Sequence, residues 1–192
     1  MVALPLGLGL GLGLAGCGSL LPRPAPALAQ FTLEGAGSKA APAAARAAAA
    51  VPGRGAPTLM VDEPRAAPGY DSARMVYLRQ PQRLQAFAFH AWVAPPARML
   101  APLLQRAMQA TGAFRAVVLA PSAASGACRL ETTLVRLVQD FGTHPSQVRL
   151  TLRAVLLDSA SGRVLAADEF DQREPAASDD PAGGAAAARA AA

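Results

Sequence analysis

The sequence has little of what an enzyme active site requires. Its 192 residues include only two cysteines and two histidines, and the histidines, His90 and His144, are far apart in the chain. No CxxC, HxH or HExxH spacing occurs, so neither zinc nor iron has a recognisable ligand set. The part expected to fold also lacks a G-x-S-x-G nucleophile motif and a glycine-rich phosphate loop. We therefore expect no catalytic residue, no metal and no cofactor.

Aromatic residues and lysines are scarce as well. Aromatics make up 5% of the chain, and Lys39 is the single lysine among 18 basic residues, which against 13 acidic ones give a net charge of +5. The arginines are spread thinly along the chain. A nucleic-acid-binding surface would gather them into a stripe with aromatics between them. We therefore expect no nucleic-acid partner.

A hydrophobic run long enough to cross a membrane is missing at the N-terminus. Residues 1–16 are uncharged and apolar, but they fall short of the ~20 residues that a membrane-spanning helix needs. A short run that ends in small residues is typical of a secretory signal peptide, although the basic start of an ordinary signal is absent. We interpret residues 1–16 as a signal peptide.

The first cysteine lies directly behind this run. Residues 14–17, Leu-Ala-Gly-Cys, resemble the bacterial lipobox, which implies cleavage between Gly16 and Cys17 and a stable lipid anchor on Cys17. Gly18 is not the aspartate that retains such lipoproteins in the inner membrane, so the expected location is the periplasmic face of the outer membrane. A disulfide between Cys17 and Cys128 is the alternative, but a lipidated sulfur cannot form it. Cys128 is then expected to be a small buried residue.

Composition divides the mature chain into three parts. Residues 17–56 are rich in Pro, Gly and Ala, and we interpret them as a lipidated N-terminus and low-complexity linker with a short strand at 31–34. Residues 57–175 carry the periodic apolar patterns of an α+β domain. Residues 176–192 contain two adjacent glycines and no apolar stripe, so we predict a frayed or truncated segment there.

The periodic part predicts a mixture of strands and one helix. A helix is expected at 97–112, ended by Gly112, with Pro102 either kinking it or delaying its start. The turn at 158–163 predicts a hairpin with the segment that follows. The fold class is therefore α+β: a mostly antiparallel sheet with one main helix packed on it, and a C-terminal helix as an option. Strands are predicted at 58–64, 74–80, 83–93, 114–121, 128–141 and 147–156.

The strand at 83–93 carries an aromatic cluster. Strict alternation places Phe87 and Phe89 on one side and His90 and Trp92 on the other, and the rigid Pro95 follows. Core packing is the first explanation for these side chains. A contact with a partner protein or with a second copy of the chain is the other explanation, because aromatics are enriched at the centres of interfaces.

The order of these segments resembles the ABC-type transport auxiliary lipoprotein family. The resemblance covers residues 14–175, from Cys17 through Phe-Thr-Leu at 31–33 to LMVDEPRAAPGYDSARMVYLRQ at 59–80 and LQAFAFHAWVAPPARML at 84–100. It implies a non-enzymatic lipoprotein of the outer membrane that docks on a mammalian-cell-entry-type protein of an ABC lipid transport system. It further implies support of phospholipid transport between the membranes, with a homo-oligomer as an option.

Two other functions fit the same features. An outer-membrane assembly or envelope-integrity lipoprotein, bound to a barrel protein or to a peptidoglycan-associated complex, would use the same tether and sheet. A small periplasmic hydrolase would use His90 or His144 as its base.

Overall fold

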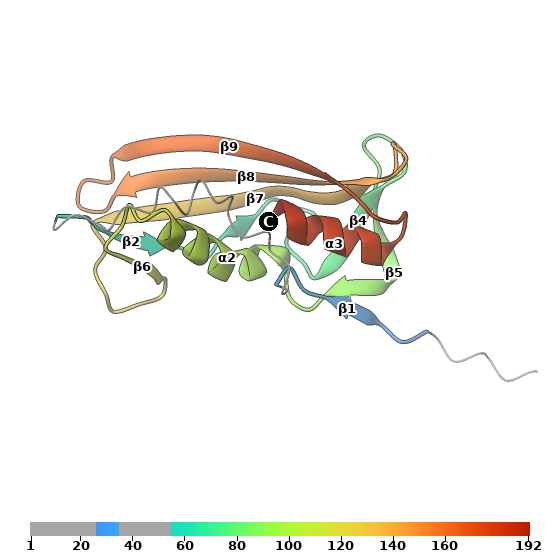
Figure 1. Cartoon of the computed structure of the whole chain (residues 1–192), viewed down its shortest axis with the longest axis horizontal. Coiled ribbons are helices and arrows are strands. Elements are labelled where there is room, and N and C mark those ends of the chain that lie inside the picture. The colour runs from blue at the N-terminus through green and yellow to red at the C-terminus, as the bar shows by residue number, and fades with distance from the viewer. Residues whose placement is uncertain (1–25, 35–54) are drawn as a thin grey trace, which may run out of the picture.

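The computed structural model describes residues 26–34 and 55–192. In these ranges the strands form one mixed sheet, and two helices, α2 and α3, lie side by side on one of its faces (Figure 1). The elements are β1 (Ala29–Phe31), β2 (Thr58–Val61), β3 (Arg65–Ala66), β4 (Arg74–Leu78), β5 (Leu84–Trp92), α2 (Pro96–Ala110), β6 (Ala116–Leu119), β7 (Cys128–Asp140), β8 (Gln147–Asp158), β9 (Val164–Pro175) and α3 (Pro181–Ala191).

Strand β7 is the centre of the sheet. One of its edges pairs with β8, and β8 pairs in turn with β9. Its other edge pairs with β2, β3 and β4 at successive positions. Strand β6 extends the sheet beyond β2, while β5 and β1 extend it beyond β4.

The direction of strand pairing corrects the predicted sheet. Only β4–β5, β7–β8 and β8–β9 are antiparallel, whereas β1–β5, β2–β6, β2–β7, β3–β7 and β4–β7 are parallel. The α+β class is confirmed, but the sheet is mixed and not mostly antiparallel. Alternation along one strand reports which face is buried and carries no information about the direction of its partner.

The hairpin predicted at 158–163 is confirmed. Oδ1 of Asp158 accepts hydrogen bonds from the backbone N–H (2.8 Å) and the hydroxyl (2.6 Å) of Ser161, which is the local bonding that makes aspartate a turn residue. Gly162 has φ of +69°, a conformation that glycine adopts without a steric penalty. The turn joins β8 to β9 in antiparallel register.

Helix α2 agrees with the helix predicted at 97–112, and Pro102 does not delay its start. It begins at Pro96, where a proline is well tolerated because its missing N–H has no helical partner there, and it keeps Pro102 in its interior. The C-cap is Thr111, whose hydroxyl donates to the carbonyl of Met108 at 2.7 Å. Gly112 follows with φ of +67°, so the predicted end of the helix is confirmed.

For residues 176–192 the optional C-terminal helix is confirmed, and the prediction of a frayed or truncated segment is wrong. The segment forms the ordered helix α3, which starts with Asp180 as N-cap: Oδ1 of Asp180 accepts the N–H of Gly183 at 2.7 Å. The helix needs no stripe of large apolar residues, because its small side chains let its backbone lie directly on the sheet. The buried residues are Gly183, Gly184, Ala185, Ala187 and Ala188.

The folded unit is wider than the predicted range 57–175. Strand β1 pairs with β5, and Leu33 joins the same core cluster as Ala185 of α3 and Leu100 of α2. Both ends of the described chain therefore contribute to one hydrophobic core beneath the two helices.

Substitution of Gly183 tests the close packing of the first turn of α3 against Ser178, which precedes the helix. A Cβ at Gly183 would collide with the backbone of Ser178. The better helix propensity of alanine is worth about 1 kcal/mol, but overpacking costs about 1–3 kcal/mol. Because the collision is with backbone atoms, the overpacking cost lies in the upper part of that range, and we expect Gly183→Ala to lower the free energy of unfolding by about 1–2 kcal/mol in urea denaturation. Gly55→Ala is the control, because no atom lies within 4 Å of the added Cβ; equal stability of the two variants would contradict the packing.

Candidate functional site

The two faces of the β8–β9 hairpin differ in chemistry. On the face away from the helices, Arg149 donates to Asp171 at 2.7 Å, and Arg153 donates to Glu169 at 3.0 Å. The hydroxyl of Thr151 also donates to Asp171 at 2.7 Å. The bonds from Arg149 and then Thr151 lower the pKa of Asp171 to about 2. This face is a ladder of paired charges that is suited to solvent.

The opposite face of the hairpin borders an apolar groove. The groove has a volume of ≈ 290 Å³ and lies between α2, the loop after it and the edge strand β9. Among the described residues that line it, Asp168 is the only charged one, and Thr132 is the only other one with a polar side chain. The lining residues are Leu104, Met108, Phe114, Leu130, Thr132, Leu152, Ala154, Leu156, Ala166, Ala167, Asp168 and Phe170.

Within residues 26–34 and 55–192 the groove is left open because the two helices cover other parts of the sheet. Helix α2 packs on β2, β6 and β7, and α3 packs on β8 and β9 near the end where the hairpin meets the rest of the chain. Strand β9 pairs with β8 alone among the described strands. Phe170 on this strand is 51% exposed, although phenylalanine is usually buried. An exposed phenylalanine beside an apolar groove makes this part of the sheet a candidate binding surface.

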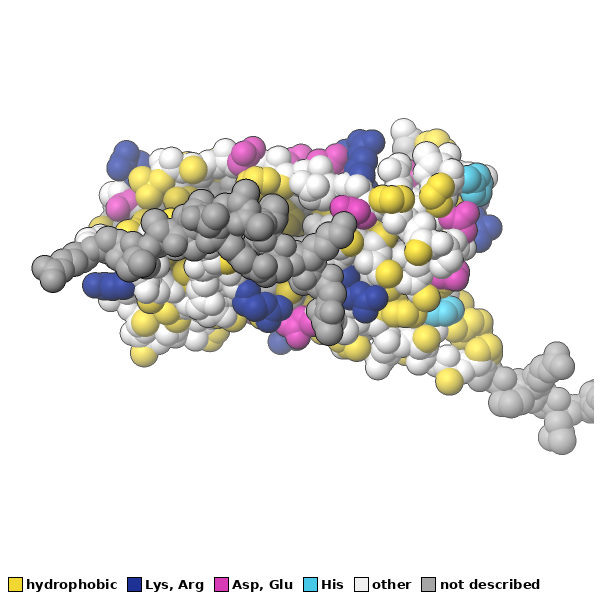
Figure 2. Space-filling model, viewed as in Figure 1, with side chains coloured by type: hydrophobic (Ala, Val, Ile, Leu, Met, Phe, Trp, Pro, Cys, Tyr) yellow, Lys and Arg dark blue, Asp and Glu magenta, His cyan; other side chains and the backbone are white. Residues whose placement is uncertain are grey.

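The basic side chains show no comparable gathering on the face that Figure 2 displays. They lie in separate places among apolar and polar groups. The apolar groove is therefore the surface feature on which a candidate site is best built.

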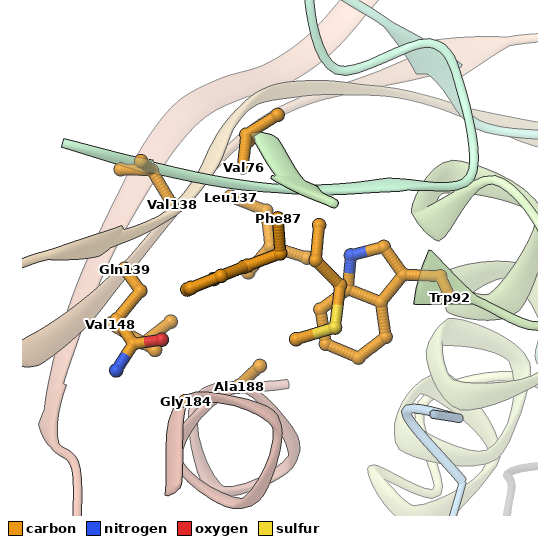
Figure 3. Close-up of a pocket in the computed structure, with 10 residues that line it drawn as sticks. Val76, Phe87, Trp92, Leu137, Val138, Gln139, Val148, Gly184 and Ala188 are labelled. Carbon is orange, nitrogen blue, oxygen red and sulfur yellow. The ribbon is translucent and has the colours of Figure 1, made fainter. Parts of the chain in front are cut away.

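A second hollow, beside α3, is a gap in the packing. It is lined by Trp92 and Phe87 together with residues of β4, β7, β8 and α3 (Figure 3), and its volume is ≈ 10 Å³. That is about the smallest space that holds one water molecule, so a ligand does not fit. Trp92 is 4% exposed. The core explanation thus holds for Trp92, and Phe87 packs beside it.

The position of Phe87 corrects the predicted alternation. Arg74 of β4 pairs with Ala91 of β5, and Val76 pairs with Ala86. Two residue steps along β4 therefore correspond to five steps along β5. The three extra residues form an irregularity that changes which side chains face inward. Phe87 and Trp92 consequently line the same cavity instead of lying on opposite faces.

The other members of the aromatic cluster lie outside that cavity. Phe89 is 43% exposed. His90 is half-buried, with its ring 6.1 Å from the ring of Phe31, and Pro95 is the half-buried N-cap of α2. The five predicted contact residues therefore do not form one surface, and Phe89 is the one most available to a partner.

The sequence analysis overlooked a polar cluster between the β7–β8 turn and α3. Asp179 accepts hydrogen bonds from the backbone N–H of Ser146 at 2.6 Å and from Nδ1 of His144 at 3.0 Å. The bond from Ser146 and then that from His144 lower the pKa of Asp179 to about 2. Ser146 is fully buried, and its hydroxyl accepts a hydrogen bond from Gln139 at 2.9 Å. The cluster ties the turn to α3 and presents no exposed nucleophile beside His144.

The lowered pKa of Asp179 predicts a pH-dependent contribution to stability. A carboxyl group with a lowered pKa stabilises the fold above its unfolded pKa near 3.9, and this contribution is lost as the pH falls toward the folded value near 2. We expect Asp179→Asn to lower Tm at pH 7 and the difference from the native chain to shrink between pH 4 and pH 2. Calorimetry at several pH values measures this, and a constant difference would contradict the role of the carboxylate.

Comparison with known proteins shows the family to which the chain belongs. A family model described as "ABC-type transport auxiliary lipoprotein component" matches residues 39–192. The chain belongs to this family. The resemblance stated from the sequence is thereby confirmed, and the match includes every helix and strand described here except β1. The family is one of transport auxiliary components and not an enzyme family.

Solved structures show the same fold. The protein XCC0632 of Xanthomonas campestris, assigned to the family DUF330, is 30% identical with a TM-score of 0.64, over 70% of this chain and 76% of that one. An uncharacterized protein is similar at 14% identity with a TM-score of 0.57, over 69% of this chain and 82% of the other. No protein with a curated description matches the sequence.

The predicted anchor lies outside the described residues. Gly16 and Cys17 precede residue 26, where the description begins, and they also precede the family match. Among the residues that are described, no helix combines the length and the hydrophobicity needed to cross a membrane. Family membership makes the chain a lipoprotein component of a transport system.

Proposed function

We propose that this chain is a non-enzymatic lipoprotein anchored through Cys17 to the periplasmic face of the outer membrane. It docks on a mammalian-cell-entry-type assembly and supports the movement of phospholipid between the membranes. The observation that carries the proposal is the family match over residues 39–192. The lipobox at residues 14–17 and the apolar groove support it, because the first supplies an anchor and the second an exposed apolar surface.

The anchor is tested with Cys17→Ser. We expect the native N-terminal peptide to start at an acylated Cys17 in mass spectrometry, because the lipobox implies cleavage before it. The variant is expected in the soluble fraction, since loss of the acyl chains removes the membrane attachment. Cys128→Ser is the matched control and should stay with the membranes. An unmodified Cys17 in the native protein would contradict the anchor.

Docking is tested by copurification from the native envelope in mild detergent. We propose that Phe89 contributes to the contact, because it is the exposed member of the aromatic cluster. Phe89→Ser is expected to reduce the recovered mammalian-cell-entry-type protein at least tenfold. Leu84→Ser, at a similarly exposed position near the start of the same strand, is the control and should leave recovery unchanged.

The same experiment separates the alternative function. Recovery of an outer-membrane barrel protein or a peptidoglycan-associated complex, without a mammalian-cell-entry-type protein, would support the assembly or envelope-integrity role instead. Unchanged recovery with Phe89→Ser would overturn the contact residue while leaving the docking proposal in place.

A further inference from the structure

We propose that the apolar groove binds one acyl chain of a phospholipid whose headgroup carries an ammonium, such as phosphatidylethanolamine. Asp168 faces the headgroup at the groove rim. The inference rests on the proposed function for the source of the ligand, a membrane phospholipid. Its other support is the size, lining and charge of the groove itself.

The length of the groove matches one acyl chain. Its floor follows β8 from Leu152 to Leu156. The four residue steps between these two positions span about 13 Å. The hydrocarbon core of a bilayer is about 30 Å thick, so the chains of one leaflet reach about 15 Å. A volume of ≈ 290 Å³ is near the lower end of the range for pockets that enclose small molecules. It holds part of one chain and leaves the headgroup outside.

The size and the lining disfavour a helical protein segment as the occupant. An α-helix with side chains is about 10–12 Å wide, so 13 Å of helix has a volume of about 1,000 Å³ and would rest only on the rim. An alkyl chain also needs no hydrogen bonds, whereas the backbone of a buried peptide does. Apart from Thr132 and Asp168, the groove is lined by apolar side chains.

The charge at the rim selects the headgroup. Asp168 lies opposite Ala154 in the β8–β9 register, on the face that borders the groove. Its neighbours Glu169 and Asp171 pair with arginines on the other face, whereas Asp168 has no ion pair within residues 26–34 and 55–192. An unpaired carboxylate beside an apolar groove attracts an ammonium group and repels an anionic headgroup.

The test measures lipid bound to the full-length chain. The chain carries Cys17→Ser, so that its own acyl groups do not compete. It is incubated with vesicles of equal parts phosphatidylethanolamine and phosphatidylglycerol, separated from them, and analysed by native mass spectrometry. We expect one bound phospholipid per chain, with phosphatidylethanolamine in excess.

Two pairs of variants locate the site. Ala166→Trp fills the groove from an exposed position and is expected to reduce binding at least tenfold, whereas Leu165→Trp on the opposite face of the same strand leaves it unchanged. Asp168→Asn is expected to reduce the preference for phosphatidylethanolamine at least threefold, and Glu169→Gln leaves that preference unchanged. Melting temperatures within a few degrees of the parent chain verify that the variants fold.

Several results would overturn the proposal. Absence of bound lipid, or equal binding by Ala166→Trp and Leu165→Trp, removes the groove as the lipid site. If no lipid is detected, and Ala166→Trp no longer recovers the partner protein or no longer self-associates, the groove is the site of a protein segment or of a second copy. The docking proposal is tested separately, by copurification. Lipid binding with the expected variant pattern would still support the groove as a lipid site if docking were not observed.

Discussion

The architecture depends on the backbone hydrogen bonding of β7. Twelve of its thirteen residues pair with β8 along one edge, while β2, β3 and β4 share the other. Since β2 meets the first half of β7 and β4 meets the second, the far side of the sheet divides into two arms. The register of β7 shifts between Leu134 and Arg136, close to where the arms separate. Among the described strands, all but β1 pair with β7 or with a strand that pairs with it, and β1 joins the sheet through β5 and β4.

The lengths of the helices relative to these strands explain the open groove. The twelve residues of β8 span about 40 Å. Helix α3 has eleven residues and is therefore about 16 Å long, so it covers less than half of that length. Gln139 donates to the hydroxyl of Ser146 and to the carbonyl of Asp180, which holds α3 at the end of β8 far from the hairpin turn. In the half of the hairpin near the turn, α3 does not cover the apolar face, and the half-buried Ala154 and Leu156 of β8 pack beside Leu104 and Met108 of α2.

Local patterns predicted the elements better than their arrangement. The strands, the hairpin at 158–163 and the helix ending before Gly112 follow from periodicity and turn chemistry, which are properties of neighbouring residues. The parallel pairs join strands distant in sequence, as when Leu59 lies beside Cys128, and no local pattern reports such a pairing. Helix α3 was predicted only as an option for a different reason: its buried face consists of glycine and alanine, whose advantage is close approach to the sheet and not hydrophobic surface.

The candidate site was harder to predict because four separate segments build it. Leu104 on α2, Leu130 on β7, Leu152 on β8 and Phe170 on β9 each read as an ordinary core residue, and only the fold shows that nothing described covers the space between them. One local signal was present. Asp168 stands between Ala166 and Phe170 in the alternation of its strand, and a carboxylate on a core-facing side is costly to bury unless it is paired. Its position therefore requires that this part of the face stays accessible to water or to a charged ligand.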